Sequence, residues 1–308
     1  MLRFAARVAV PCAMLLQGAC APPPVFTPPP RMAGLEGEVR EIIRRHAGDT
    51  AEVSVAFLDL RTGDSLLVEA HRPLHAASTM KVPVMLELFR RADAGELSLG
   101  DSVMVRNQFR SIADGSTYAL DPADDSDSTL YARIGRRLPV RALIELMITR
   151  SSNLATNLLI DLADPRRIAR TMESIGAGEM RVLRGVEDGP AFRAGMNNTT
   201  SAHALMRVMA AVADGRAASP AASREMAEIL GRQEFTEMIP AGVPPGTRTA
   251  NKTGSITRIA HDAAIVYPPG RAPYVLVVMT HGFATPASAA PVGREISAAV
   301  WRHVTGAR

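Results

Sequence analysis

Lysine occurs at only two positions in this chain, Lys81 and Lys252, and both lie in short polar motifs that could do chemistry. The sequence holds 35 Lys plus Arg residues, so the other 33 basic residues (35 − 2) are arginine. A neutral lysine amine can accept a proton when burial lowers its pKa, whereas arginine stays protonated in proteins. Proton transfer is therefore a physical reason for lysine at position 81, and the placement of both lysines in such motifs favours a chemical requirement.

The first lysine lies three residues after a serine in the stretch STMK, so Ser78 and Lys81 share a face if this stretch is helical. A serine hydroxyl attacks a carbonyl only when a nearby base takes its proton, and a lysine at this spacing can be that base. The pattern predicts Ser78 as a nucleophile and Lys81 as its proton acceptor. Taken alone, it also fits an ordinary helix start with a solvated lysine.

Two further motifs follow in order along the chain. SSN places Ser151 and Asn153 at the start of a predicted helix, where both also suit an N-cap. KTG, residues 252–254, lies in a strand-like segment. The compact ammonium of Lys252 can hold a substrate carboxylate in a narrow cleft, and Gly254 permits a substrate to approach the strand closely.

The order S-x-x-K, S-x-N and K-T-G resembles that of the penicillin-recognising serine hydrolases and is most similar to class A serine β-lactamases. The resemblance runs from about Leu35 to the end of the chain. It implies hydrolysis of a β-lactam amide through a covalent acyl-serine, with no cofactor and no metal. An oxyanion hole would be formed by the backbone N–H groups of Ser78 and Ser255. The residues that the resemblance implies as catalytic are Ser78, Lys81, Ser151, Glu187 and Lys252, and those that it implies as substrate-binding are Asn153, Thr253, Gly254, Ser255 and Arg258.

The match is incomplete at the step that releases the acyl group. By the resemblance, Glu187 on an omega-shaped loop activates a water molecule, and Asn157 braces that loop. The family usually has asparagine four residues after the glutamate, where this chain has Ala191, and Asp188 is a competing carboxylate. Ser152 also replaces the aspartate of the usual S-D-N. We therefore expect intact acylation and leave deacylation open.

Other polar patterns have simpler interpretations. His71 and His75 are four residues apart but have no clear third ligand, so no metal site is expected. The stretch DPADDSDS lacks the glycine and the final glutamate of an EF-hand, which favours a solvated acidic loop. His261 and Asp262 are adjacent on a predicted strand and would point to opposite faces, which argues against a Ser-His-Asp triad with Ser78.

Strand patterns near both ends of the chain enclose a helical middle. This predicts an α/β (α+β) fold with a mainly antiparallel five-stranded sheet flanked by helices, formed by both chain ends, and an inserted all-helical subdomain. The α/β part would comprise residues 35–90 and 205–308, and the helical part residues 91–204. The predicted helices are 35–48, 78–95 with Pro83 in its first turn, 138–150, 153–164, 165–176, 199–215, 219–232 and 291–304. The predicted strands are 51–60, 64–70, 246–254, 261–268 and 272–282, and residues 100–138 are expected to be irregular.

The N-terminus has the pattern of an export leader, with Arg3 and Arg7 before a short apolar stretch and small residues. We expect a signal peptide or lipoprotein leader over residues 1–21, a Pro-rich linker over 22–34 and a catalytic domain over 35–308. QGAC resembles a lipoprotein box, so Cys20 is a candidate for a lipid anchor. Both cysteines, Cys12 and Cys20, lie in this leader, which excludes thiol chemistry from the domain.

The charge of the chain limits the kinds of partner that we expect. The net charge of +4 is spread along the chain without a basic stripe, so nucleic acid is not expected. We expect a periplasmic or secreted monomer, or a membrane-anchored one, acting on a small β-lactam or a peptidoglycan-like substrate. The rival functions are a D-alanyl-D-alanine peptidase, a penicillin-binding domain that stays acylated, and a hydrolase of unrelated esters.

Overall fold

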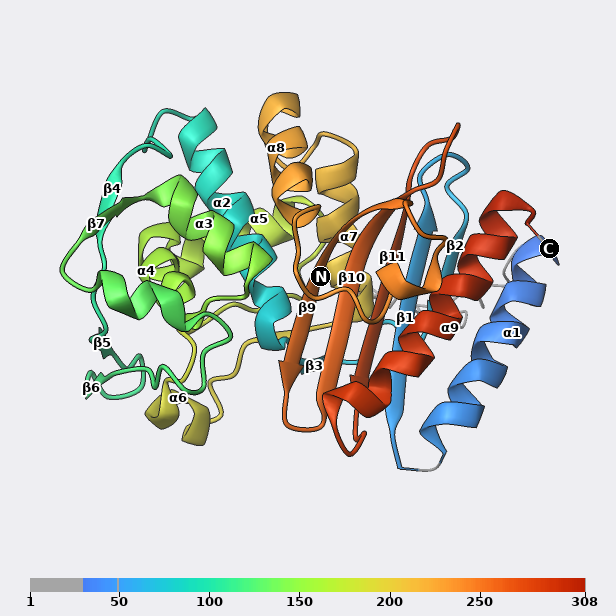
Figure 1. Ribbon diagram of the computed structural model, residues 1–308, viewed down its shortest axis with the longest axis horizontal. Helices are drawn as coiled ribbons and strands as arrows, with labels where there is room; N and C mark the ends of the chain where they lie inside the picture. The colour runs from blue at the N-terminus through green and yellow to red at the C-terminus, as the bar shows by residue number, and fades with distance from the viewer. Residues whose placement is uncertain (1–29, 49, 308) are drawn as a thin grey trace, which may run out of the picture.

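The computed structural model describes residues 30–48 and 50–307, which form two halves lying side by side (Figure 1). One half is a β-sheet covered by helices, and the other is mainly helical. The predicted leader with Cys20, and residues 22–29 of the predicted linker, lie outside the described residues. None of the described helices combines the length and the apolar character needed to cross a membrane.

An antiparallel sheet of five strands has the spatial order β2-β1-β11-β10-β9. Its two halves come from opposite ends of the chain and meet where β1 pairs with β11. Helices cover both faces, so β10 and β11 are buried at nearly every position and have continuous apolar sequences. β9 is an edge strand. The strands are β1 (Glu52–Asp59), β2 (Ser65–Val68), β9 (Arg248–Ile256), β10 (Ile259–Tyr267) and β11 (Tyr274–His281).

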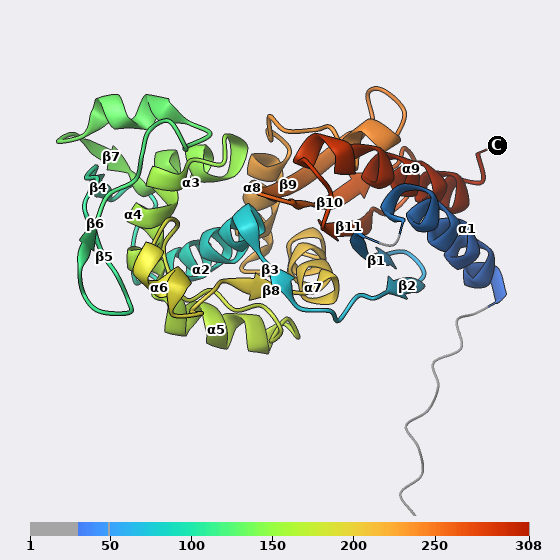
Figure 2. The same cartoon turned by 90° about the horizontal axis from the view of Figure 1, so that it is seen from below.

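Three helices complete the layers of this half. α1 (Pro30–Ala47) and α9 (Pro286–Thr305) lie on one face of the sheet, and α7 (Ala202–Ala213) lies on the other (Figure 2). A hydrophobic core lies on each face of the sheet. Alternate residues of β1 contribute to each core, because successive strand residues point to opposite faces. Val55 and Phe57 pack with the α1 and α9 side chains, whereas Ala56 packs on the α7 side.

The helical half is built around α2 (Lys81–Asp93), which is buried at every position from Lys81 to Phe89. It follows directly after a short 3-10 helix, η1 (Ala77–Met80), at the border of the two halves. α2 packs against α3 (Val140–Thr149), α4 (Asn153–Ala163), α5 (Pro165–Ser174) and α8 (Pro220–Leu230). A helix enclosed in this way carries apolar residues on all sides, as VPVMLELF does.

The connecting segments are more ordered than the sequence suggested. Residues 100–138, expected to be irregular, contain paired short strands and a 3-10 helix. Strands of two or three residues show too little alternation to be recognised from sequence. These elements are β4 (Ser102–Met104), β5 (Phe109–Arg110), β6 (Thr117–Tyr118), η2 (Ser128–Arg133) and β7 (Arg137–Pro139); elsewhere lie β3 (Leu74–His75), α6 (Gly189–Arg193), β8 (Thr199–Thr200) and η3 (Pro240–Gly242).

The predicted fold class is confirmed, although two helices begin earlier than expected. α1 begins at Pro30 rather than near Leu35, and Met32 in its first turns is buried. α9 begins at Pro286, where Thr285 and Ser288 form a capping box. Pro291, taken from the sequence as the start of the last helix, lies inside it. Proline favours the first helical position, and here Pro286 occupies that position instead.

Candidate active site

Ser78 lies in η1, at the border between the sheet and the helical half, and lines two adjoining cavities. Ala77 before it has a φ of 46°, an uncommon conformation for a residue with a side chain. Thr79 after it donates a hydrogen bond from Oγ1 to Ala76 O at 2.6 Å, which ties down the turn. Ser78 in η1 and Lys81 at the start of α2 are three residues apart in one continuous helical run, and this spacing places them on the same side of the run.

Lys81 is fully buried at the start of α2. Its Nζ donates hydrogen bonds to Ser151 O at 2.6 Å, Ser151 Oγ at 3.1 Å and Asn153 Oδ1 at 2.9 Å. Burial lowers the pKa of Lys81 to about 7, although the nearby carboxylates of Asp125 and Glu187 act to raise it. A substantial fraction of this amine is therefore neutral near neutral pH and able to accept a proton.

Ser151 joins the two lysines of the chain. Its Oγ lies 3.1 Å from Lys81 Nζ and 3.1 Å from Lys252 Nζ. Lys252 is also fully buried, and burial followed by the proximity of Lys81 lowers its pKa well below the usual value. Ser151 has a φ of 57°, a strained conformation of the kind that clusters at functional sites.

An acidic side chain from residues 100–138, called the inserted loop below, holds this motif in place. The sequence predicted a solvated acidic loop around Asp125, but this side chain is buried. Asp125 accepts backbone N–H bonds from Asn153 at 2.8 Å and Leu154 at 2.9 Å, and a hydroxyl bond from Tyr131 at 3.0 Å. Ser152 supplies a second cap by accepting from Ala155 N at 3.3 Å. The negative charge at the N-terminus of α4 thus comes from a distant segment.

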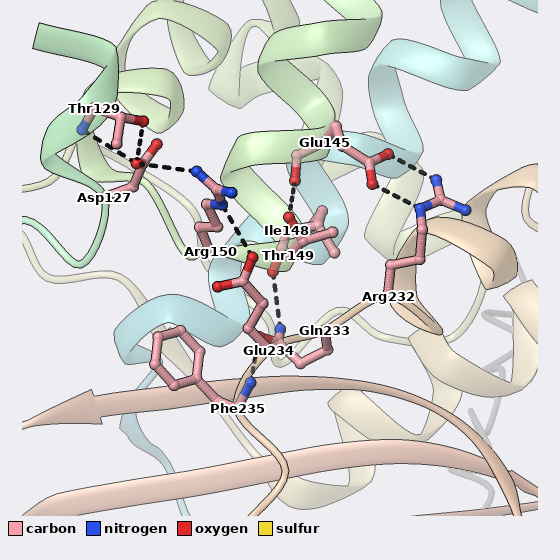
Figure 3. A network of polar contacts seen from close by, with 10 residues as sticks. All are labelled: Asp127, Thr129, Glu145, Ile148, Thr149, Arg150, Arg232, Gln233, Glu234 and Phe235. Carbon is pink, nitrogen blue, oxygen red and sulfur yellow. Dashed lines mark hydrogen bonds and ion pairs between the residues drawn. The ribbon is translucent and has the colours of Figure 1, made fainter.

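The residue before Ser151 anchors this motif to other elements (Figure 3). Arg150 donates from Nε to Glu234 at 2.9 Å and lies 3.8 Å from Asp127 of the inserted loop. Gln233 donates to Ile148 O at 2.8 Å, so the segment after α8 is bonded to the end of α3. The position of Ser151 is therefore supported by two segments that are distant in sequence, the one with Asp127 and the one after α8.

Glu187 faces the same group of side chains from the loop between α5 and α7. Its carboxylate accepts from Asn153 Nδ2 at 3.3 Å and from Asp121 N at 3.4 Å. Burial raises the pKa of Glu187, hydrogen bonds from Asp121 N and Asn153 oppose this, and nearby acidic residues add to the rise. Asn157 braces the loop by bonding both the N–H and the C=O of Val186, at 2.6 and 2.9 Å.

The competing carboxylate, Asp188, has a different position. It is fully buried and accepts from Ile112 N at 3.0 Å and Ala191 N at 3.1 Å, which caps α6. Both carboxylate oxygens of Asp188 therefore already accept hydrogen bonds from backbone N–H groups. Glu187 is thus the residue of the two that is hydrogen-bonded to the SSN motif.

The KTGS segment lies on β9, the edge strand beside η1, and Thr253, Gly254 and Ser255 line the cavity at Ser78. The structure adds a reason for Gly254 beyond substrate approach. A Cβ at this position would lie 3.0 Å from Thr79 Cγ2 and 3.2 Å from Ala76 O. The glycine therefore lets β9 pack directly against the turn that carries Ser78.

Arg258 lies apart from the other predicted residues. It occupies the turn between β9 and β10, and its guanidinium donates to Gly282 O at 3.1 Å. It does not line either of the cavities at Ser78.

His261 and Asp262 point to opposite faces of β10, as the strand pattern predicted. His261 Nε2 bonds to His75 O at 3.0 Å and its Nδ1 accepts from Thr280 N at 3.1 Å, while burial lowers its pKa to about 4. Asp262 accepts from Ile239 N at 3.0 Å on the other face of the sheet. The two residues therefore do not form a relay to Ser78.

Comparison with known proteins agrees with this geometry. The family model described as "Beta-lactamase enzyme family" matches residues 34–304. A β-lactamase of Streptomyces fradiae is 28% identical over 281 residues, which cover 90% of this chain and 88% of that protein. A β-lactamase structure from Xanthomonas campestris is 25% identical with a TM-score of 0.76, over 89% of this chain and 98% of that one. An ancestral class A β-lactamase shares the fold, at 24% identity and a TM-score of 0.74, over 87% of this chain and 99% of that one. The chain thus has the class A fold and belongs to the β-lactamase enzyme family.

Proposed function

We propose that this chain hydrolyses β-lactams through a covalent ester on Ser78. The observation that carries the proposal is the buried chain of hydrogen bonds from Lys81 through Ser151 to Lys252, beside the cavity that Ser78 lines. A lysine with a pKa of about 7 is matched to proton transfer at neutral pH. Family membership supplies the substrate class, and these contacts support the serine mechanism.

In the acylation step, Ser78 Oγ would form a bond to the β-lactam carbonyl carbon while Lys81 accepts the hydroxyl proton. The carbon–nitrogen bond of the ring then breaks, and the leaving nitrogen takes a proton from Ser151. Either lysine can return a proton to Ser151, because the Oγ of Ser151 is 3.1 Å from both Nζ atoms. The free edge of β9, together with Lys252 when it is protonated, would hold the substrate carboxylate and acyl chain.

In the deacylation step, Glu187 would activate the water that hydrolyses the ester. Its place beside Asn153 suits this role, and its raised pKa makes it a stronger base than an ordinary glutamate. This chain has Ala191 where the class A family has asparagine, so the water would have one hydrogen-bond partner fewer. Deacylation is therefore the slower step in this proposal.

The test is to mix the protein with a chromogenic cephalosporin and follow absorbance and intact mass together. Sustained turnover that disappears in Ser78→Ala supports the proposal. Glu187→Gln should then accumulate acyl-enzyme, because acylation proceeds without that carboxylate. Turnover that persists in Ser78→Ala would refute the acyl-serine mechanism. A mass increase without turnover in the wild type would identify an acyl acceptor of the peptidase or sensor type.

We also propose that the enzyme is exported, since its first 21 residues have the pattern of a leader. Cys20 would carry a lipid if the QGAC sequence is processed as a lipoprotein box. Fractionation of cells expressing the full chain tests both points. Recovery of the wild type in membranes and of Cys20→Ser in the soluble exported fraction would support the anchor, and recovery of both in the cytoplasm would exclude export.

A further inference from the structure

The structure brings together three side chains that are distant in sequence and that no catalytic step uses. His71 precedes β3, Glu179 follows α5, and His203 lies in the first turn of α7. One ligand atom from each, two imidazole nitrogens and one carboxylate oxygen, lie within 4.8 Å of one another. The sequence had paired His71 with His75, which instead accepts a hydrogen bond from Ala77 N.

We propose that His71, Glu179 and His203 bind a divalent transition-metal ion such as Zn²⁺. Two imidazoles and one carboxylate are a donor set that zinc accepts, with a water molecule in the fourth position. Ligand atoms about 3.4 Å apart are required at the zinc–nitrogen and zinc–oxygen bond lengths of a tetrahedral site. The three ligand atoms lie within 4.8 Å of one another, so metal binding would require side-chain rotations that bring them closer; His71 and Glu179 are exposed and His203 is half-buried.

The existing contacts already hold the three side chains near this geometry. His71 Nδ1 bonds to Glu179 Oε1 at 2.8 Å, and the rings of His71 and His203 lie 4.5 Å apart, centroid to centroid. Ser201 donates its hydroxyl to the second oxygen of Glu179, which orients the carboxylate toward the imidazoles. Outer-shell bonds of this kind position metal ligands.

One cationic side chain lies near the cluster. Arg207 is one turn further along α7 than His203, and its guanidinium lies against Gly176.

The cluster lies next to the segments that carry Ser78 and Glu187, so a bound ion would affect the active site. β3 leads directly into the turn that carries Ser78, and it pairs with β8, which ends the loop that carries Glu187. At the start of the same loop, Arg181 pairs with Thr199. A metal at the three ligands would therefore cross-link both ends of the Glu187 loop to the strand that enters η1.

The test is titration of the full-length metal-free protein with Zn²⁺ in a calorimeter, and with Co²⁺ followed by its visible absorption. We expect one equivalent of metal to bind, with the cobalt bands of a four-coordinate nitrogen and oxygen site, and to raise the Tm. His71→Asn and His203→Asn should each weaken binding by at least about tenfold.

His281→Asn is the matched control. His281 also pairs with a carboxylate, 3.5 Å from Glu52, but among the described residues it belongs to no group of three such ligands. Its replacement should leave the titration unchanged. Absence of stoichiometric binding by the wild type, or full binding by a folded His203→Asn variant, would overturn the proposal. Neither readout depends on β-lactam turnover, so the result is independent of the proposed activity.

Discussion

At the scale of single residues, the site depends on a lysine that can lose its proton. Lys81→Arg keeps the positive charge but provides a guanidinium that does not deprotonate. We expect acylation to slow by at least about 100-fold, the low end of what general base catalysis contributes. Rapid-quench mass spectrometry of the acyl-enzyme measures this rate directly.

Because the larger side chain could disturb packing, Lys81→Met serves as a second variant of similar length. Its circular dichroism spectrum should be that of a folded protein, and its acylation should be equally slow. Normal acylation in either folded variant would remove Lys81 from the role of proton acceptor.

The same residue gives acylation a defined pH dependence. Only the neutral amine accepts the proton, and the pKa of Lys81 is about 7, so the acylation rate should rise with pH and level off above 8. Asp125 acts to raise this pKa, so Asp125→Asn should shift the rise to lower pH. Stopped-flow acylation between pH 5.5 and 9 measures both curves. A rate independent of pH across this range would contradict the assignment.

At the scale of elements, the N-terminus of α4 depends on a carboxylate from another segment. Asp125→Asn removes the charge and one of the two oxygens that accept from Asn153 and Leu154. Loss of a helix cap costs about 1 to 2 kcal/mol, and we expect the free energy of unfolding to fall by that amount. Urea denaturation measures it.

Asp121→Asn is the matched control for this substitution. It lies in the same inserted loop, and its exposed side chain accepts from the neighbouring Ala123 N at 2.9 Å. Its replacement should change the free energy of unfolding by less than about 0.5 kcal/mol, as for most surface substitutions. Equal effects of the two substitutions would mean that Asp125 does not act as the cap.

Two glycines should respond in opposite directions to alanine. Gly254→Ala places a Cβ against Thr79 and Ala76 and should destabilise the fold by about 1 to 3 kcal/mol. Gly37 lies on the exposed side of α1, where an added Cβ would meet no atom within 4 Å, so Gly37→Ala should stabilise by about 0.5 to 1 kcal/mol. Thermal unfolding compares the two, and a stabilising Gly254→Ala would exclude the tight contact of β9 with η1.

At the scale of the whole molecule, the sequence predicted the fold and supplied the candidate acylation residues, which stay predictions, but it did not predict the contacts that support them. Ser78, Lys81 and the later motifs were recognisable because their chemistry needs particular residue types at short spacings. Asp125 acts on Asn153 from 28 positions away, and His71 meets Glu179 across 108 positions. Such contacts are set by the folded chain and leave no periodic or local pattern.

Burial of both lysines also couples folding to pH. The pKa of Lys81 falls from the ordinary 10.5 to about 7 on folding, so between these values the unfolded chain holds a proton that the folded chain lacks. Unfolding then takes up a proton, and the stability must rise with pH through this window. Each such group contributes at most about 1.4 kcal/mol per pH unit, and Lys252 shifts in the same direction.

We expect urea denaturation to show this rise in the free energy of unfolding from pH 7.5 to 9.5, below the range in which tyrosines ionise. Lys81→Met should have a smaller slope, because the titrating amine is removed. A free energy of unfolding that stays level or falls over this range in the wild type would mean that Lys81 remains charged in the folded protein.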